Sequence, residues 1–178
     1  MFVDRDGTIN PDLRYLAEAS RVEVFLGVAQ GIRLLRSHGY RVLCTTNQSG
    51  IERGYYQHAD VAAIHARVNE ILAKGGARID AFYYCPHAPE SGCACRKPGT
   101  GMLEKAADDW NVDLAGSAIV GDRSLDVEAG EALGLLTVVV PPPGHERRVE
   151  LELASREIQP DIRAAGFLEG ALRVLTRG

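Results

Sequence analysis

The sequence contains no apolar run near the roughly 18 residues that a membrane-spanning helix needs. Its first residues, 1–6, lack the apolar core of a signal peptide. Basic residues are not in excess, because 20 Lys and Arg stand against 24 Asp and Glu, for a formal net charge of −4. This balance argues against binding nucleic acid through its phosphate backbone. We therefore expect a cytoplasmic protein that binds neither membranes nor nucleic acids.

Internal repeats and low-complexity tracts are also missing from the 178 residues. Only four cysteines are present, and three of them lie within eleven residues together with His87, which is typical of metal ligands and not of a secreted disulfide framework. Compact domains usually hold about 100–200 residues. We therefore expect a single domain over residues 1–178, acting as a monomer.

Short apolar runs alternate with helical periodicities, which is typical of β-α-β units around a parallel sheet. The apolar runs predict strands at 2–3, 40–46, 79–84, 118–120 and 136–140. Apolar stripes predict helices that contain Val28, Ile32 and Leu35; Ile64, Val68, Ile71 and Leu72; Leu103, Ala106, Ala107 and Trp110; and Phe167, Leu168, Ala171, Leu172 and Leu175. Ser124 is expected to cap a further helix that ends at Gly134. The prediction is an α/β fold with a doubly wound, mostly parallel sheet, with no assignment for the charged stretch 146–157.

Polar side chains follow four of the predicted strands. In a doubly wound sheet, ligands bind beyond the carboxyl ends of the strands. The residues found there are Asp4 and Asp6, Thr46, Lys97 and Asp122. Asp4 and Asp6 lie two residues apart, so an extended strand projects both to the same side. Together with Asp122 they predict an oxygen-rich Mg²⁺ site, because Mg²⁺ prefers such ligands and also binds substrate phosphate oxygens.

These groups suit the hydrolysis of a phosphate monoester. Asp4 would attack phosphorus and form an aspartyl-phosphate, which divides one difficult step into two. Asp6 would protonate the leaving alcohol and then take a proton from the water that resolves the intermediate. Thr46 would donate a hydrogen bond to the phosphoryl oxygens, while Lys97 and Mg²⁺ neutralise their charge.

Three other interpretations stay open at this point. The first acidic pair alone is equally typical of a solvated turn, but the matching groups at three further strand ends argue against that. A phospho-acceptor receiver domain also combines acidic residues with Thr and Lys, but it would not need Asp6 or a metal-binding loop. A stable aspartyl-phosphate without turnover would favour the receiver. The last interpretation is an inactive metal-binding interaction module.

Three cysteines lie with a histidine in one short segment. Cys85, His87, Cys93 and Cys95 form the pattern C-x-H-x5-C-x-C. Thiolates and imidazole in a closed tetrahedron are typical of a structural Zn²⁺ site. A disulfide between Cys93 and Cys95 is geometrically poor at that spacing. The fourth cysteine, Cys44, lies in a predicted strand and is expected in the core.

Four ordered motifs resemble those of the haloacid dehalogenase (HAD) superfamily, namely Asp4–Asn10, Thr46–Ile51, Arg96–Pro98 and Gly121–Asp126. From residue 2 to about 140 the chain more closely resembles the heptose-bisphosphate and histidinol-phosphate phosphatases, which share the zinc loop. The resemblance implies a Rossmann-like HAD fold. It also implies Mg²⁺ held by the Asp4 carboxylate, the Asp6 backbone carbonyl and Asp122. The implied reaction is removal of the C7 phosphate of a heptose 1,7-bisphosphate for nucleotide-activated heptose, with histidinol phosphate as the alternative substrate.

The substrate is expected to be a small phosphorylated sugar in an open site. No cap domain is predicted, because only 16 residues lie between Asn10 and Gly27. A bisphosphate needs a second anion site, and guanidinium groups bind phosphate well. The resemblance and these charges together suggest substrate contacts by Asp12, Arg14, Tyr15, Asn47, Gln48, Ser49, Arg53, Arg96 and Arg123. For Arg53, a solvated surface charge is an equally good interpretation.

Overall fold

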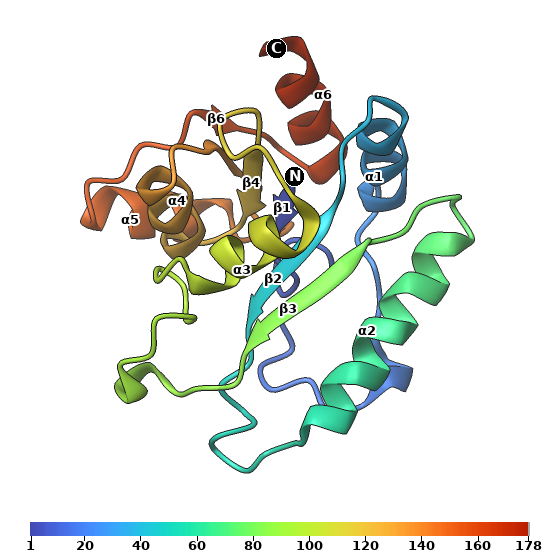
Figure 1. Cartoon of the computed structure of the whole chain (residues 1–178), viewed down its shortest axis with the longest axis vertical. Helices are drawn as coiled ribbons and strands as arrows, with labels where there is room; N and C mark the ends of the chain where they lie inside the picture. The colour runs from blue at the N-terminus through green and yellow to red at the C-terminus, as the bar shows by residue number, and fades with distance from the viewer. Residues whose placement is uncertain (178) are drawn as a thin grey trace.

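The computed structural model describes residues 1–177, which contain one six-stranded sheet whose neighbouring strands all pair in parallel (Figure 1). The strand order is β3-β2-β1-β4-β5-β6. The strands are β1 (Phe2–Val3), β2 (Leu43–Asn47), β3 (Ala81–Cys85), β4 (Ala118–Gly121), β5 (Leu136–Val139) and β6 (Ile162–Arg163). The order reverses between β1 and β4, and this switch point is where doubly wound sheets bind ligands. The predicted doubly wound sheet is confirmed.

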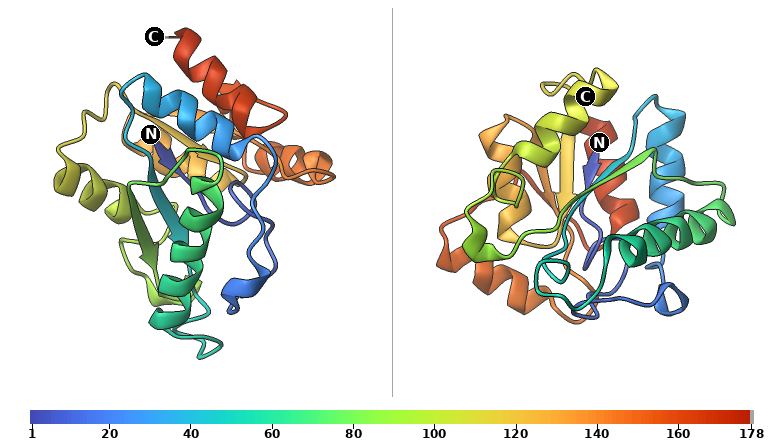
Figure 2. Two further views of the ribbon diagram at one scale, coloured as in Figure 1. Left: turned by 90° about the vertical axis from the view of Figure 1, so that its right-hand side faces the viewer. Right: turned by 60° about the horizontal axis from the view of Figure 1, so that its bottom comes forward.

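Six α-helices cover the two faces of the sheet within the described residues (Figure 2). They are α1 (Val28–Ser37), α2 (His58–Ala73), α3 (Gly101–Trp110), α4 (Ser124–Ala132), α5 (Glu146–Ser155) and α6 (Phe167–Arg177). Two 3-10 turns, η1 (Ala19–Arg21) and η2 (Pro89–Ser91), lie in loops. Helices α1, α2 and α6 share one apolar cluster with the sheet, whereas α3, α4 and α5 pack on the other face.

Adjacent residues of the central strand face opposite helix layers. Phe2 packs in the cluster that contains Leu103 of α3, and Val3 packs in the cluster that contains Val28 of α1. Side chains alternate along a strand, so a strand covered on both faces must be apolar at consecutive positions. This explains why the strands appear in the sequence as continuous apolar runs.

The structure corrects the sequence-based boundaries near the C-terminal half. Ser124 is the first residue of α4 and not its cap, because the N-cap is Arg123, whose backbone N–H donates to Asp126 Oδ2 at 3.2 Å. The unassigned charged stretch forms α5, which is anchored by Val149 and Leu153 against the apolar face of α4 and β5. Two buried apolar residues in a charged helix produce too weak a periodicity to predict it.

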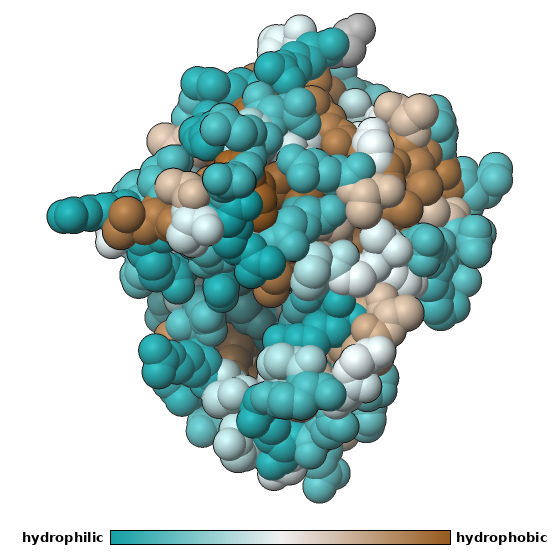
Figure 3. All heavy atoms as spheres, turned by 90° about the vertical axis from the view of Figure 1, so that its left-hand side faces the viewer, coloured by the Kyte–Doolittle hydropathy of each residue, from teal (hydrophilic) through white to brown (hydrophobic). Residues whose placement is uncertain are grey.

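The loops that follow β1, β2 and β3 border the carboxyl edge of the sheet. No domain is inserted between the elements of residues 1–177, which agrees with the predicted absence of a cap domain. No helix in these residues combines the length and the apolar character that crossing a bilayer requires. On the face drawn in Figure 3, hydrophilic side chains predominate and hydrophobic ones show in smaller areas between them.

Candidate functional site

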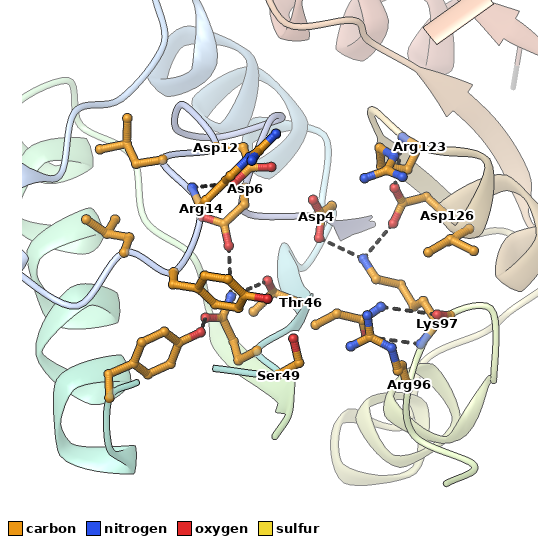
Figure 4. Close-up of a pocket in the computed structure, with 17 residues that line it drawn as sticks. Asp4, Asp6, Asp12, Arg14, Thr46, Ser49, Arg96, Lys97, Arg123 and Asp126 are labelled. Atoms are coloured by element: carbon orange, nitrogen blue, oxygen red, sulfur yellow. Dashed lines mark hydrogen bonds and ion pairs between the residues drawn. The ribbon is translucent and has the colours of Figure 1, made fainter. Parts of the chain in front are cut away.

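A cavity of about 440 Å³ lies where the ends of β1, β2 and β4 meet (Figure 4). Twelve of the predicted site residues line it, namely Asp4, Asp6, Asp12, Arg14, Tyr15, Thr46, Asn47, Gln48, Ser49, Arg96, Lys97 and Arg123. Leu13, in the predicted contact loop 12–15, also lines it, and four lining residues were not predicted: Leu16, Tyr56, Leu125 and Asp126. Of the proposed substrate contacts only Arg53 stays outside this lining, and it pairs with Glu90 at 3.5 Å.

Lys97 connects two carboxylates at the base of the cavity. Its Nζ donates to Asp4 Oδ1 at 2.7 Å, to Asp126 Oδ1 at 2.5 Å and to the Thr45 carbonyl at 2.7 Å. Burial alone would lower the pKa of Lys97, but the Asp126 and Asp4 carboxylates raise it above its ordinary value. All three ammonium protons are therefore used, and the charge is held beside Asp4 (Figure 4).

Three buried carboxylates gather around this lysine. Asp4, Asp122 and Asp126 each place one carboxylate oxygen within 4.8 Å of the others. Burial raises the pKa of Asp4 to about 7 although Lys97 opposes the shift, and burial together with Asp4 raises the pKa of Asp122 to about 8. Asp122 Oδ1 is buried and has no hydrogen-bond partner among the described residues. Such crowded, partly unpartnered oxygens fit a hard divalent cation.

Asp126 is the acidic residue that sequence reasoning missed. It lies four residues after Asp122 and in the first turn of α4, so its carboxylate points back to the end of β4. That spacing after a strand end was the available signal. Gly7 also shapes this cluster, because its φ is 91° and an added Cβ would overlap the Asp122 carboxylate.

Asp6 lines the same cavity as Asp4, but its carboxylate has a separate set of partners. It accepts hydrogen bonds from Arg5 at 2.8 Å, from Asn10 Nδ2 at 2.9 Å and from Gln48 Nε2 at 2.8 Å. Burial opposes ionisation of Asp6, but the Arg5 guanidinium together with the Asn10 and Gln48 hydrogen bonds outweighs it and holds the pKa below its usual value. Arg5 is itself fully buried, so the sequence motif contributes a positioning cation between its two acidic residues.

The amides that follow Thr46 point into the protein. Asn47 Nδ2 donates to the Lys97 carbonyl at 3.1 Å, and its Oδ1 accepts from the Lys97 backbone N–H at 3.1 Å. Gln48 is 2% exposed, and its Nε2 donates to Thr46 Oγ1 at 2.9 Å. Both amides therefore form hydrogen bonds with neighbouring site residues, although each lines the cavity.

Three guanidinium groups stand around the outer wall of the cavity. Arg14 belongs to a loop with left-handed backbone, with φ of 45° at Arg14 and 53° at Tyr15, and such non-glycine residues cluster at functional sites. Arg96 donates to the His87 carbonyl at 3.2 Å. Arg123 pairs with Glu152 of α5 at 2.8 Å. The outer wall is thus suited to an anion, whereas the base carries the acidic groups.

The metal loop, residues 85–95, brings its four predicted zinc ligands together in one cluster. The sulfur atoms of Cys85, Cys93 and Cys95 lie 3.2–3.5 Å apart, and His87 Nδ1 is 3.5 Å from Cys85 and 3.3 Å from Cys95. A tetrahedral Zn²⁺ with bonds of about 2.3 Å has ligands about 3.8 Å apart, so this donor set fits the ion. The loop is tied down by Glu52, whose carboxylate accepts from Ser91 Oγ at 2.6 Å. All four cysteines lie in the described part of the chain and none forms a disulfide there, and Cys44 is buried in β2 as expected.

Comparisons with known proteins support one group of enzymes. Residues 94–169 match the family model described as HAD-hydrolase-like, and residues 11–131 match the model of polynucleotide kinase 3 phosphatase. The chain is 40% identical to D-glycero-beta-D-manno-heptose-1,7-bisphosphate 7-phosphatase of Pseudomonas putida, over 84% of this chain and 86% of the relative. It is also 40% identical to a probable D-glycero-D-manno-heptose-1,7-bisphosphate 7-phosphatase of Thermoplasma acidophilum, over 76% of this chain and 85% of the relative.

A solved structure is similar over the whole chain. It is the D,D-heptose 1.7-bisphosphate phosphatase from B. bronchiseptica, complexed with magnesium and phosphate. The two chains are 32% identical and superpose with a TM-score of 0.87, covering 100% of this chain and 98% of the other.

Proposed function

Because the chain belongs to the heptose-bisphosphate phosphatase family of the HAD superfamily and is a phosphoric monoester hydrolase, we propose that it removes the C7 phosphate of D-glycero-D-manno-heptose 1,7-bisphosphate. One observation carries the proposal: a buried Asp4–Lys97 pair lies at the base of a cavity whose outer wall holds three guanidinium groups. The base suits the reacting phosphate, and the outer wall suits the phosphate that remains at C1. Membership of a phosphatase family sets aside the receiver domain and the inactive module.

We propose that Mg²⁺ is held by the Asp4 carboxylate, the Asp6 backbone carbonyl and Asp122, with Asp126 close by. The unpartnered Asp122 Oδ1 and the raised pKa values of Asp4 and Asp122 support a cation here. When bound, the ion supplies positive charge that neutralises the phosphoryl oxygens. The similar solved structure is complexed with magnesium, which supports Mg²⁺ as the cation.

The proposed reaction begins with attack by Asp4. Its carboxylate oxygen bonds to phosphorus as the bond to the sugar oxygen breaks, and Lys97 keeps Asp4 anionic. Asp6 donates a proton to the departing oxygen. Although its partners hold its pKa low, a phosphate dianion arriving beside Asp6 raises its proton affinity. Asp6 then accepts a proton from the water that cleaves the aspartyl-phosphate, which restores Asp4. Thr46 donates to the phosphoryl oxygens throughout.

The metal loop has a structural role in this proposal. We propose that it binds Zn²⁺ through Cys85, His87, Cys93 and Cys95, leaving no open position for water. The chain continues from Cys95 directly into Arg96 and Lys97, so ordering the loop also orders the lysine. We further propose that residues 1–178 form one domain that works as a monomer in the cytoplasm, with no membrane or nucleic-acid partner.

A phosphate-release panel tests the substrate. It contains both anomers of the heptose bisphosphate, histidinol phosphate and simple sugar phosphates, each with and without Mg²⁺. We expect Mg²⁺-dependent release to have the highest kcat/KM for a heptose bisphosphate, with the C1 phosphate retained. Clear preference for histidinol phosphate would overturn the substrate assignment and leave the catalytic roles in place.

A further inference from the structure

A buried chain of hydrogen bonds connects Tyr56 to two of the proposed catalytic groups. The Tyr56 hydroxyl lies 2.7 Å from Gln48 Oε1. Gln48 Nε2 lies 2.8 Å from Asp6 Oδ2 and 2.9 Å from Thr46 Oγ1. Gln48 and Thr46 are 2% and 1% exposed, so water has little access to the Gln48 amide and the Thr46 hydroxyl. The chain runs from the wall of the cavity, which Tyr56 lines, to its base.

The direction of every bond in this chain follows from its acidic end. An ionised Asp6 only accepts hydrogen bonds, so the nitrogen of the Gln48 amide must face it. The amide oxygen therefore faces Tyr56, whose hydroxyl must donate. Burial raises the pKa of Tyr56 to about 12, which keeps that proton in place.

The same directions determine where the Thr46 proton points. Thr46 Oγ1 accepts the second proton of the Gln48 amide nitrogen. In residues 1–177 the Thr46 hydroxyl has no bond to an acceptor of the protein, so its own proton is free for a group in the cavity. One amide thereby bonds to a carboxylate and leaves the proton of a neighbouring hydroxyl free.

Tyr56 is itself fixed by close packing. It is 7% exposed, and Gly50 lies so near its ring that an added Cβ would overlap ring atoms. The Tyr56 hydroxyl therefore has little freedom to move away from Gln48. This preorganisation is what a group needs if it is to hold catalytic residues in one geometry.

We propose that Gln48, held by Tyr56, is a positioning residue that keeps the Asp6 carboxylate beside the leaving oxygen and directs the Thr46 hydroxyl proton to the phosphoryl group. The inference rests on the proposed roles of Asp6 and Thr46, and it replaces direct sugar contact as the role of Gln48. A residue that only binds substrate alters KM, whereas one that positions an acid alters kcat, most strongly when the leaving group is poor.

The test compares Gln48→Met and Tyr56→Phe with the wild type on two substrates. The first is p-nitrophenyl phosphate, whose leaving group needs little protonation. The second is the primary sugar phosphate that the wild type hydrolyses fastest. We expect Gln48→Met to lower kcat on the sugar phosphate about 10- to 100-fold and on the aryl phosphate about 3- to 10-fold, with KM within about twofold. Tyr56→Phe should show the same pattern with about a threefold loss on the sugar phosphate.

Tyr83→Phe is the matched control. It also removes a phenolic hydrogen bond, to Asp109 at 2.9 Å, but Tyr83 lies outside the cavity, and its kcat should stay unchanged. Melting temperatures of all variants separate misfolding from mispositioning. Equal losses on both substrates, a rise in KM alone, or an equal effect of Tyr83→Phe would each overturn the inference. If Gln48→Met keeps the wild-type kcat while Asp6→Asn is inactive, only the positioning role is overturned. If Asp6→Asn is fully active, the proposed mechanism itself is overturned.

Discussion

At the scale of single residues, charge balance around Lys97 organises the site. Its ammonium separates Asp4 from Asp126 and neutralises part of a cluster that would otherwise favour protonation. Removing one partner of a buried ion pair leaves an unpaired charge, which is costly. Because Lys97 has two carboxylates and a carbonyl, it keeps partners when one of them is replaced. Single substitutions here should therefore separate chemistry from folding.

Asp4→Asn should reduce phosphate release by about 10⁴-fold or more, because an amide is a far poorer nucleophile than a carboxylate. Folding should be largely preserved, since burial already favours a neutral group at this position. Steady-state phosphate release and the melting temperature measure the two effects. Asp108→Asn, on the exposed side of α3, serves as the control and should behave like the wild type. Near-normal activity of Asp4→Asn would remove Asp4 as the nucleophile.

Asp126→Asn should weaken Mg²⁺ binding about 10- to 100-fold, because one of three clustered carboxylates becomes neutral. Calorimetric titration with Mg²⁺ measures the affinity directly, independently of turnover. Glu128→Gln is the control on the same helix, since Glu128 pairs with Arg156 outside the cluster. Unchanged Mg²⁺ affinity in Asp126→Asn would show that Asp126 only pairs with Lys97 and does not contribute to the cation site.

At the scale of elements, the loops after β2 and β3 hold each other in place. The Gln48 backbone N–H donates to the Cys85 carbonyl at 2.7 Å, and the Glu52 N–H donates to the Pro86 carbonyl at 3.2 Å. Asn47 adds the two bonds to the Lys97 backbone. The metal loop is therefore part of the wall that supports the site, although its cysteines do not line the cavity.

Cys93→Ser should lower both zinc content and stability, because a loop with almost no apolar core depends on its metal for order. Zinc per chain by elemental analysis and thermal melting are the measurements. Cys44→Ala is the matched cysteine control, and it should keep its zinc even though a core cavity lowers its melting temperature. A full complement of zinc in Cys93→Ser would contradict the assigned ligand set.

Helix α2 contains a buried histidine that makes the fold sensitive to acid. His65 stacks on Phe82, and burial lowers its pKa to about 3, helped by the charge on Arg5. The folded state holds His65 neutral. Its contribution to the free energy of unfolding is therefore complete above pH 6.5 and declines as the pH falls toward 3. At pH 5 the loss is about 2 kcal/mol, from 1.5 pH units at about 1.4 kcal/mol each.

His65→Phe should therefore lose less stability than the wild type between pH 7 and pH 5. Chemical denaturation at both pH values gives the free energies of unfolding, and the difference between the two proteins cancels effects of the metal loop. His38→Phe, at an exposed position, should follow the wild type. If His65→Phe and the wild type lost equal free energy of unfolding between pH 7 and pH 5, His65 would not be a neutral buried group in the folded state.

At the scale of the whole molecule, α5 joins the C-terminal part of the chain to the site. Glu152 accepts hydrogen bonds from Arg123 Nε at 2.8 Å, from the Ser124 N–H at 3.0 Å and from Ser124 Oγ at 2.8 Å. Arg148 of the same helix reaches Asp122 Oδ2 at 3.4 Å. Helix α5, which follows the last recognised motif, therefore holds Arg123, which lines the cavity.

Glu152→Ala should destabilise the protein by about 1–2 kcal/mol, because it leaves the donors of Arg123 and Ser124 without their acceptor. Thermal melting measures this loss. Glu150→Ala, two residues earlier on α5, removes only an exposed pair with Arg163 and should cost less than about 1 kcal/mol. Equal effects of the two substitutions would mean that the link between α5 and the site adds no stability.

The sequence predicts some of the helices and strands and not others. The strands around β1 and the helices α1 to α3 were predictable, because their apolar periodicity is strong. Glycines also follow α1 and α2. Helix α5 and strand β6 were not, since one is a charged helix with two buried anchors and the other has only two residues. Among site residues, those directly after strands were predicted. Asp126 lay inside a recognised motif without an assigned role, and only the tertiary structure revealed Tyr56.

Local spacing alone determined the motifs of this protein: the acidic pair after the first strand, the lysine after the metal loop, and the four side chains proposed to bind zinc. These depend on neighbours within a few residues, so the chain order is enough to predict them. Only the tertiary structure decided which partner each polar group takes. Lys97 bonds to Asp4 across 93 positions and to Asp126 across 29, while Arg53 pairs with Glu90 outside the lining of the cavity. Such pairings follow from packing and burial in three dimensions, which no short-range pattern encodes.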